Sequence, residues 1–311
     1  MMPFAPSLII RDLNQSDGQA ASELINRQLA NAAYSAAMDE GELNEQLFSP
    51  QPSTLLPVRW QQRAVLGAWR AGSLAGLLDV AAGQDHDNQD LPDYKPIGLV
   101  RFAVLPQRQE LVDEVAYALW DAAEAFWRRN RVVEVKAFHI STGYPSFQAG
   151  AGILPGDWSE HVRLLTNRGF TFTDRYYCMQ CPLGTPLEEV VPQGGLSLAF
   201  RGAIAERRYQ VFYRRTELIA EARLVQRRVA EGDALVPIGY LAHWEVEERW
   251  RNQRVGRWLL RRILNDAAQQ GLAQVVLHLK LNASAAMNLL AQHGFIEENY
   301  RGYTFGRHLE A

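Results

Sequence analysis

The fold of this chain is decided by residues 238–262, which read IGYLAHWEVEERWRNQRVGRWLLRR. The pattern predicts a strand that ends near Val246, a polar turn, and a helix that begins close to Gly256. The first N–H groups of a helix have no partner within the helix, and the helix dipole adds partial positive charge there. We therefore expect this turn to hold a phosphate or pyrophosphate group.

The side chains of the turn suit an anionic ligand. Arginine side chains supply charge-assisted donors, and Gly256 lacks a Cβ where a ligand would approach the backbone. An alternative is an ordinary solvated helix start that carries several arginines. The expected cofactor-binding residues are Val246, Arg251, Asn252, Gln253, Arg254, Val255, Gly256 and Arg257.

Strand and helix patterns alternate on both sides of this stretch. In the second half we expect a hairpin at 208–229, strands at 236–247, 274–281 and 295–306, and helices at 254–270 and 284–292. In the first half we expect a strand at 8–10, helical sequence to about Met38, a hairpin at 64–80 that turns at Ala71-Gly72, strands at 97–105, 132–140 and 170–180, a helix at 110–130, and a short helix after 157. The acidic segment 81–96 is typical of a mobile loop.

Two pairs of similar words indicate an internal duplication. Pro96-Ile97-Gly98-Leu99 matches Pro237-Ile238-Gly239-Tyr240, and Leu164 to Phe170 matches Leu289 to Phe295. The two offsets, 141 and 125, differ by 16 residues, which is close to the length of the Gly/Pro-rich segment 141–157 in the first half. Periodicity is lost between Pro182 and Gly195. We therefore expect two domains of a mixed α/β (α+β) class, over residues 1–185 and 195–311.

Residues 238–295 resemble the GCN5-related N-acetyltransferase (GNAT) superfamily, whose acetyl-CoA motif is Gln/Arg-x-x-Gly-x-Gly/Ala after a strand. The chain has Arg251-Asn252-Gln253-Arg254-Val255-Gly256, followed by an Arg-x-Leu-Leu helix start, and a later helix ends in Gly294-Phe295. The sequence departs from the motif at Arg254, which replaces the first glycine. The two-domain arrangement is similar to that of mycothiol synthase-like enzymes.

The resemblance implies a fold and an activity. The fold would be two tandem GNAT-like domains, each a mixed central sheet flanked by helices, with splayed strands 4 and 5. The activity would be transfer of an acetyl group from the cosubstrate acetyl-CoA to a primary amine of a small molecule or peptide. The corresponding turn of the first half, residues 104–114, has no glycine and carries Glu110, Asp113 and Glu114. Because carboxylates repel phosphates, we expect the N-terminal domain to be degenerate.

Acyl transfer to an amine needs a base for the amine proton and a donor for the thiolate. By the resemblance, His278 falls where some relatives carry a glutamate base, and an imidazole pKa near about 6.5 would suit that role. His243 and Glu245, on one strand face by alternation, are further candidates. The tyrosine acid of relatives is replaced by Leu290, so Tyr300 or Tyr303 could substitute. Each of these side chains could instead have a purely structural role.

Composition excludes several other classes. No apolar run is long enough to span a bilayer, and the N-terminal sequence lacks the basic region of a signal peptide. With Cys178 and Cys181 as the only cysteines, we expect no metal site and a cytoplasmic location. Residues 1–190 have 15 basic and 23 acidic side chains, and residues 191–311 have 17 and 12, so anions favour the second half. This balance is too mild for a nucleic-acid-binding protein.

A rival from another class stays open. Loss of the usual tyrosine and of one motif glycine would also fit a catalytically inactive acyl-CoA-binding or interaction protein on the same fold. Neither the acceptor amine nor the oligomeric state can be predicted from the sequence.

Overall fold

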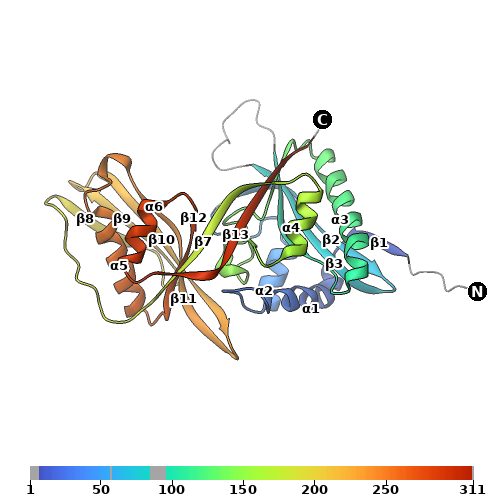
Figure 1. The fold of residues 1–311 in the computed structure, drawn as a ribbon, viewed down its shortest axis with the longest axis horizontal. Helices are drawn as coiled ribbons and strands as arrows, with labels where there is room; N and C mark the ends of the chain where they lie inside the picture. The colour runs from blue at the N-terminus through green and yellow to red at the C-terminus, as the bar shows by residue number, and fades with distance from the viewer. Residues whose placement is uncertain (1–6, 57, 85–95, 310–311) are drawn as a thin grey trace, which may run out of the picture. The chain divides into compact units, whose positions relative to one another are not determined.

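The computed structural model describes residues 7–56, 58–84 and 96–309. The chain forms two compact units (Figure 1). Unit 1 is Met1–Arg175 with Gly302–Ala311, and unit 2 is Tyr176–Arg301. The division falls inside two strands, β7 (Thr171–Pro182) and β13 (Ile296–His308). The domain ranges 1–185 and 195–311 stay a prediction about the duplicated sequence.

Unit 1 is a mixed sheet with helices packed against it. Helices α1 and α3 both contact β3. Its strands follow the order β1-β2-β3-β4-β5-β13, with β6 paired to β13. The strands are β1 (Leu8–Asp12), β2 (Arg59–Arg70), β3 (Ser73–Gln84), β4 (Ile97–Val104), β5 (Glu134–Ala137), β6 (Leu154–Pro155) and the unit 1 parts of β7 and β13. The helices are η1 (Gln15–Asp17), α1 (Gly18–Leu29), α2 (Glu40–Leu43), η2 (Asn44–Phe48), α3 (Gln109–Arg129), η4 (Gln148–Gly150) and α4 (Ser159–Asn167).

Unit 2 also has mixed strand pairing, with strands in the order β7-β12-β11-β10-β9-β8. Helix α5 contacts β9, β10, β11 and β12, and Leu290 of α6 belongs to the same apolar core as Leu259 and Ile263 of α5. The remaining strands are β8 (Leu196–Arg201), β9 (Glu206–Tyr213), β10 (Glu217–Glu231), β11 (Ala234–Val246) and β12 (Gln274–Lys280). The helices are η5 (Glu248–Trp250), α5 (Val255–Gln269) and α6 (Ser284–Ala291).

The two halves of the sequence exchange strands. Residues 305–308 of β13 pair with β5 inside unit 1, and Phe305 is part of the unit 1 core. Residues 176–182 of β7 pair along the whole of β12 inside unit 2. Each sheet is therefore completed by a strand from the other half of the sequence.

The two halves also correspond in their strand register, at the positions where the sequence words match. The parallel β4–β5 ladder pairs Gly98 with Val135, and the parallel β11–β12 ladder pairs Gly239 with Val275. Both strands then bulge against their antiparallel neighbour. The extra residue is Arg101 in β4 and Ala242 in β11, and these two positions are again 141 residues apart. The expected mixed α/β fold with splayed central strands is thus confirmed.

Local sequence explains most of the elements. The Ala71-Gly72 turn has φ values of 49° and 79°, which suit a tight hairpin turn. Two expectations need correction. Helical sequence was expected to about Met38, but α1 ends at Leu29. The hairpin extends to Gln84, so residues 81–84 are strand rather than loop. Residues 85–95 of the expected loop lie outside the described residues.

Candidate active site

The central strands of unit 2 separate soon after they meet. The β11–β12 ladder consists of Gly239–Val275 and Tyr240–Val276, whereas β11 continues to Val246 and β12 to Lys280. Residues 242–246 of β11 are partly or fully exposed. The separated part of β11 therefore offers side chains and backbone to a ligand.

The predicted phosphate-binding turn lies at the surface. Residues 251–254, which connect η5 with α5, are all exposed. The first intrahelical bond at the start of α5 runs from Trp258 N to the Arg254 carbonyl oxygen at 3.0 Å. The amides of Val255, Gly256 and Arg257 precede this bond. An anion at this turn would accept hydrogen bonds from these three N–H groups.

The backbone of the turn adopts the glycine-like conformation of the motif. Arg254, which replaces the first glycine, has φ 64° and ψ 5°, and Asn252 also has φ 64°. Asparagine tolerates this left-handed region, whereas arginine adopts it at an energetic cost. Arg254 therefore adopts a backbone conformation that favours glycine.

The side chains of the turn make several contacts. Arg251 Nε donates to the Val246 carbonyl oxygen at 3.0 Å, and Gln253 Nε2 donates to the Arg249 carbonyl oxygen at 2.8 Å. Arg257 Nη2 donates to Gln292 Oε1 at 2.7 Å. Arg251 thereby joins the turn to the end of β11.

The reason expected for Gly256 needs correction. A Cβ at this position would lie 3.4 Å from Val246 Cγ2, 3.6 Å from Trp244 Cζ2 and 3.8 Å from Leu289 Cδ2. These are ordinary van der Waals distances to protein side chains. A Cβ at position 256 would thus point toward β11 and α6 rather than toward a ligand.

His278 lies on β12 just beyond the end of the β11–β12 ladder, between two tyrosines. Its Nδ1 is 3.0 Å from the Tyr240 hydroxyl, and its Nε2 is 2.7 Å from the Tyr300 hydroxyl. Burial lowers the pKa of His278 to about 3 and raises that of Tyr240. The expected pKa near about 6.5 is therefore wrong for this environment, and His278 is neutral at pH 7. The sequence did not reveal Tyr240 as its partner.

His243 and Glu245 lie together, as alternation predicts. His243 Nε2 is 3.3 Å from Glu221 Oε1 and 3.8 Å from Glu245 Oε2. Glu221 and Glu245 are directly opposite each other on β10 and β11, and their side chains are 46% and 60% exposed. The pair forms an acidic patch that would attract a protonated amine.

These groups share one face of the unit 2 sheet. Leu224 and Leu241 are paired and both face the core that contains α5. Their neighbours on the other side of the bulge, Arg223 and His243, are paired with each other, and so they face away from α5. Tyr240, adjacent to Leu241, also faces away, together with His278. The bulge at Ala242 keeps His243 and Tyr240 on the same side.

The other candidates lie elsewhere. Tyr303 belongs to unit 1, where its ring packs 5.2 Å from Phe172. Leu290, at the place of the usual tyrosine, is fully buried in the unit 2 core. Cys178 and Cys181 are free and buried, and burial raises the pKa of Cys178 to about 12. Tyr300, which belongs to unit 2, is the tyrosine that the structure places beside His278, and a catalytic role for Tyr303 stays a prediction.

The equivalent region of unit 1 is filled by its own side chains. Residues 101–104 of β4 are all buried. His161 Nε2 lies 3.1 Å from the Ala103 carbonyl oxygen, and burial lowers its pKa to about 4. Phe102 packs against Tyr144, Phe147 and Trp158 at centroid distances of 5.0–6.2 Å. Two of these rings come from the segment 141–157, which only the first half has.

Arg101, the bulge residue of β4, is buried in a polar cluster. Its guanidinium donates to Asp79 Oδ2 at 3.0 Å, to Gln46 Oε1 at 2.6 Å and to the Thr142 carbonyl oxygen at 3.0 Å. Tyr144 also donates to Asp79. The bulge position thus carries a large charged side chain in unit 1 and only a methyl group, that of Ala242, in unit 2.

Comparisons with known proteins agree with this architecture. A sequence model of the acetyltransferase (GNAT) family matches residues 187–295. A tandem GNAT protein from the clavulanic acid biosynthesis pathway, solved without AcCoA, is 14% identical with a TM-score of 0.68, over 98% of this chain and 99% of that one. Residues 187–295 thus resemble the GNAT family in sequence, and the whole chain has the fold of the tandem GNAT protein.

Two further structures have a fold similar to that of this chain. One is a glucosamine N-acetyltransferase region of a fungal multi-domain GH3 β-N-acetylglucosaminidase, at 12% identity and TM-score 0.71, which covers 97% of this chain and 38% of that one. The other is a GCN5-related N-acetyltransferase from Sphaerobacter thermophilus, at 12% identity and TM-score 0.62, over 98% and 96% of the two chains. A search of curated proteins gave no match.

Membrane-spanning helices and metal-binding clusters were also sought in the described residues. Within the described ranges, no helix is long and apolar enough to cross a membrane. The same ranges contain no group of three or more His, Cys, Asp or Glu side chains placed to hold a metal ion.

Proposed function

We propose that this chain transfers an acetyl group from acetyl-CoA to a primary amine of a small molecule or peptide. The main support is the contrast between the two bulged strands. Residues 242–246 of β11 are accessible beside an exposed turn, whereas residues 101–104 of β4 are completely buried. Acetyl-CoA would therefore bind to unit 2, with unit 1 as the degenerate copy.

In this proposal the turn holds the diphosphate of acetyl-CoA. The donors are the amides of residues 255–257, and Arg251, Arg254 and Arg257 supply positive charge. Val246, Asn252 and Gln253 complete the proposed contact surface at the end of β11. The thioester would then lie along the separated part of β11, next to the bulge.

The chemistry needs one proton acceptor and one donor. Attack of the amine nitrogen on the thioester carbonyl carbon forms the C–N bond, breaks the C–S bond and moves one proton from nitrogen to sulfur. We assign the acceptor role to His243, which lies on the separated part of β11 beside Glu221 and Glu245, where a cationic amine would approach. Tyr300 is assigned to donate a proton to sulfur. Neutral His278 orients the Tyr300 hydroxyl, because a group with a pKa of about 3 is a poor base at pH 7.

Calorimetry with acetyl-CoA tests the binding step. Combined reversal of two charges, Arg251→Glu with Arg254→Glu, should weaken binding at least about tenfold because the diphosphate loses two cationic partners. Arg108→Glu, in the corresponding turn of unit 1, is the matched control and should leave the affinity unchanged. Equal effects of the two changes would contradict a unit 2 site.

A thiol-release assay over a panel of polyamines, amino sugars and peptide N-termini tests turnover. Release that depends on the amine supports the transferase. Tight acetyl-CoA binding without release on any amine would support the rival, a catalytically inactive acyl-CoA-binding protein. No binding of acetyl-CoA would reject both.

A further inference from the structure

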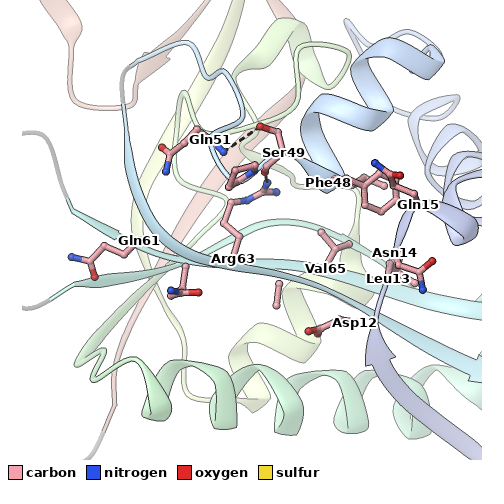
Figure 2. Close-up of a pocket in the computed structure, with 14 residues that line it drawn as sticks. Asp12, Leu13, Asn14, Gln15, Phe48, Ser49, Gln51, Gln61, Arg63 and Val65 are labelled. Atoms are coloured by element: carbon pink, nitrogen blue, oxygen red, sulfur yellow. Dashed lines mark hydrogen bonds between the residues drawn. The ribbon is translucent and has the colours of Figure 1, made fainter.

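Unit 1 contains a polar groove of about 480 Å³. It lies between the end of β1, the segment after η2 and the first half of β2 (Figure 2). Most of its polar lining consists of carboxamide and hydroxyl groups, and Asp12 is the one carboxylate among the lining residues. The lining residues that matter here are Gln15, Ser49, Gln51, Gln61, Gln62 and Arg63.

The floor of this groove is an open edge of β2. β2 pairs with β3 along its full length, from Arg59 to Arg70. On its other side β1 pairs with β2 only from Leu66 to Arg70, and one more bond runs from Leu13 N to the Val65 carbonyl oxygen at 2.8 Å. The β1 ladder therefore ends before residues 61–64 of β2.

Backbone alternation shows which groups face the groove. The N–H and C=O groups of a residue in an antiparallel ladder point to the same side, and those of the next residue point to the opposite side. Since the Val65 carbonyl points toward β1, the N–H and C=O of Arg63 also point toward the open edge. The register between Arg63 and Val65 is regular, so this alternation is uninterrupted.

The two ends of the open edge are closed by the protein. Gln51 Nε2 donates to the Trp60 carbonyl oxygen at 2.9 Å at one end, and the Leu13–Val65 bond closes the other. Residues 61–65 span about 13 Å at the usual rise of a strand. The groove is therefore long enough for a short extended segment of three or four residues.

The Arg63 side chain fixes this part of β2 to neighbouring segments. The Arg63 guanidinium donates to the Ser49 carbonyl oxygen at 2.6 Å and to the Gln46 carbonyl oxygen at 2.7 Å, and it pairs with Asp79 at 3.1 Å. Figure 2 shows Arg63 reaching from β2 toward the segment that carries Ser49. A strand fixed in this way is preorganised, which reduces the entropy lost when it binds a partner.

We propose that this groove binds a short extended peptide segment of another protein by strand addition to β2, antiparallel to β2 and in line with β1. The peptide main chain pairs with the N–H and C=O of Arg63, the residue of the open edge whose backbone groups face the groove. The carboxamides of Gln51, Gln61 and Gln62 hydrogen bond to its side chains. Because Asp12 adds negative charge and the Arg63 charge is paired with Asp79, the segment is polar and neutral or basic. The groove lies entirely in unit 1, so this inference is independent of acetyl transfer.

The test uses arrays of capped random-sequence hexapeptides that lack Asp and Glu, probed with the full-length protein. A second array carries the same sequences with every second amide N-methylated, which removes main-chain donors and leaves the side chains in place. We expect binders in the first array, with affinity at least about tenfold lower after N-methylation. Hydrogen exchange of residues 59–66 should slow on addition of the best binder, while that of residues 234–246 should not change.

Variants locate the binding site. Ser49→Trp fills the groove and should weaken peptide binding at least about tenfold, as should Gln62→Trp on β2. Ser73→Trp, at the exposed first residue of β3, is the matched control and should bind normally. Thermal unfolding identifies any variant that fails to fold, and the other groove variant then decides.

Three results would overturn the proposal. These are the absence of binders in the array, equal binding of N-methylated peptides, and binding that Ser49→Trp and Gln62→Trp leave intact. Self-association of the free protein that Ser49→Trp abolishes would also overturn it, since the occupant would then be a second copy of this chain.

Discussion

The Nε2 atom of His278 lies 2.7 Å from the hydroxyl oxygen of Tyr300. Because the Nδ1 atom of the same ring is 3.0 Å from Tyr240, a neutral imidazole can serve both tyrosines, as donor to one and acceptor from the other. Protonation would make both nitrogens donors and would place a charge in a desolvated site. The neutral ring is therefore part of the folded structure.

This arrangement predicts how stability depends on pH. The pKa of His278 falls from 6.5 to about 3 on folding, so the unfolded chain binds its proton more tightly. The contribution of the neutral ring is complete above about pH 6.5 and declines as the pH falls toward 3, by at most about 1.4 kcal/mol per pH unit. Urea unfolding at pH 7, 6 and 5 should show a steeper loss for the native protein than for His278→Gln.

His161 is a second buried histidine and needs its own control. Its pKa is lowered to about 4, so His161→Gln should reduce the same pH dependence, by a smaller amount. A pH profile that is identical in the native protein and both variants would show that neither ring is kept neutral by folding.

Tyr300 should matter for turnover rather than for binding. Tyr300→Phe removes the proposed proton donor and should lower kcat about 100-fold, with little change in KM for acetyl-CoA. Tyr303→Phe is the matched control, because Tyr303 belongs to unit 1, and kcat should stay unchanged. A larger loss in the Tyr303 variant would reverse the assignment.

The left-handed conformation of Arg254 should cost stability. Replacing it by glycine removes about 1–2 kcal/mol of backbone strain. Part of this stabilisation is lost because glycine gives the unfolded chain more conformational entropy. Arg254→Gly should therefore raise the free energy of unfolding by about 0.5–1 kcal/mol. Asn252→Gly, at the same φ of 64°, should gain less because asparagine tolerates this region. Denaturant titration of both variants measures the difference, and equal gains would argue against strain at Arg254.

Asp79 should be the most sensitive carboxylate in unit 1. It is fully buried and accepts bonds from Arg63, Arg101 and Tyr144. Asp79→Asn leaves two buried guanidinium groups without a counter-charge, which should cost about 3–5 kcal/mol. Glu114→Gln breaks the exposed Arg70–Glu114 pair and should cost less than about 1 kcal/mol. A small effect at Asp79, measured by urea unfolding, would mean that water or relaxation compensates the charges.

Much of the fold could be predicted from local sequence. The strand–turn–helix at 238–262, the Ala71-Gly72 hairpin and the repeated Pro-Ile-Gly word depend on short-range patterns, and each has its counterpart in the structure. The location of the shared bulge could not be read in this way, because a bulge is defined by the register between two strands.

The candidate site was less accessible to sequence reasoning. His278 could be singled out as a polar residue in an apolar run, but its low pKa depends on Tyr240 and Tyr300, which are 38 and 22 residues away. The filling of unit 1 by His161 and Arg101 is likewise a matter of long-range packing. A Gly/Pro-rich segment at 141–157 was the one sequence signal that could have pointed to it.

The exchanged strands make the order of synthesis matter for folding. Residues 305–308 pair with β5 and bring Phe305 into the unit 1 core, yet they leave the ribosome well after β5. At about 5–20 residues per second, roughly 6–24 s separate the emergence of β7 from that of this strand. During that interval the edge of β5 is uncovered and the first half cannot complete its sheet. The two halves therefore have to mature together, although the repeated sequence words suggest two similar units.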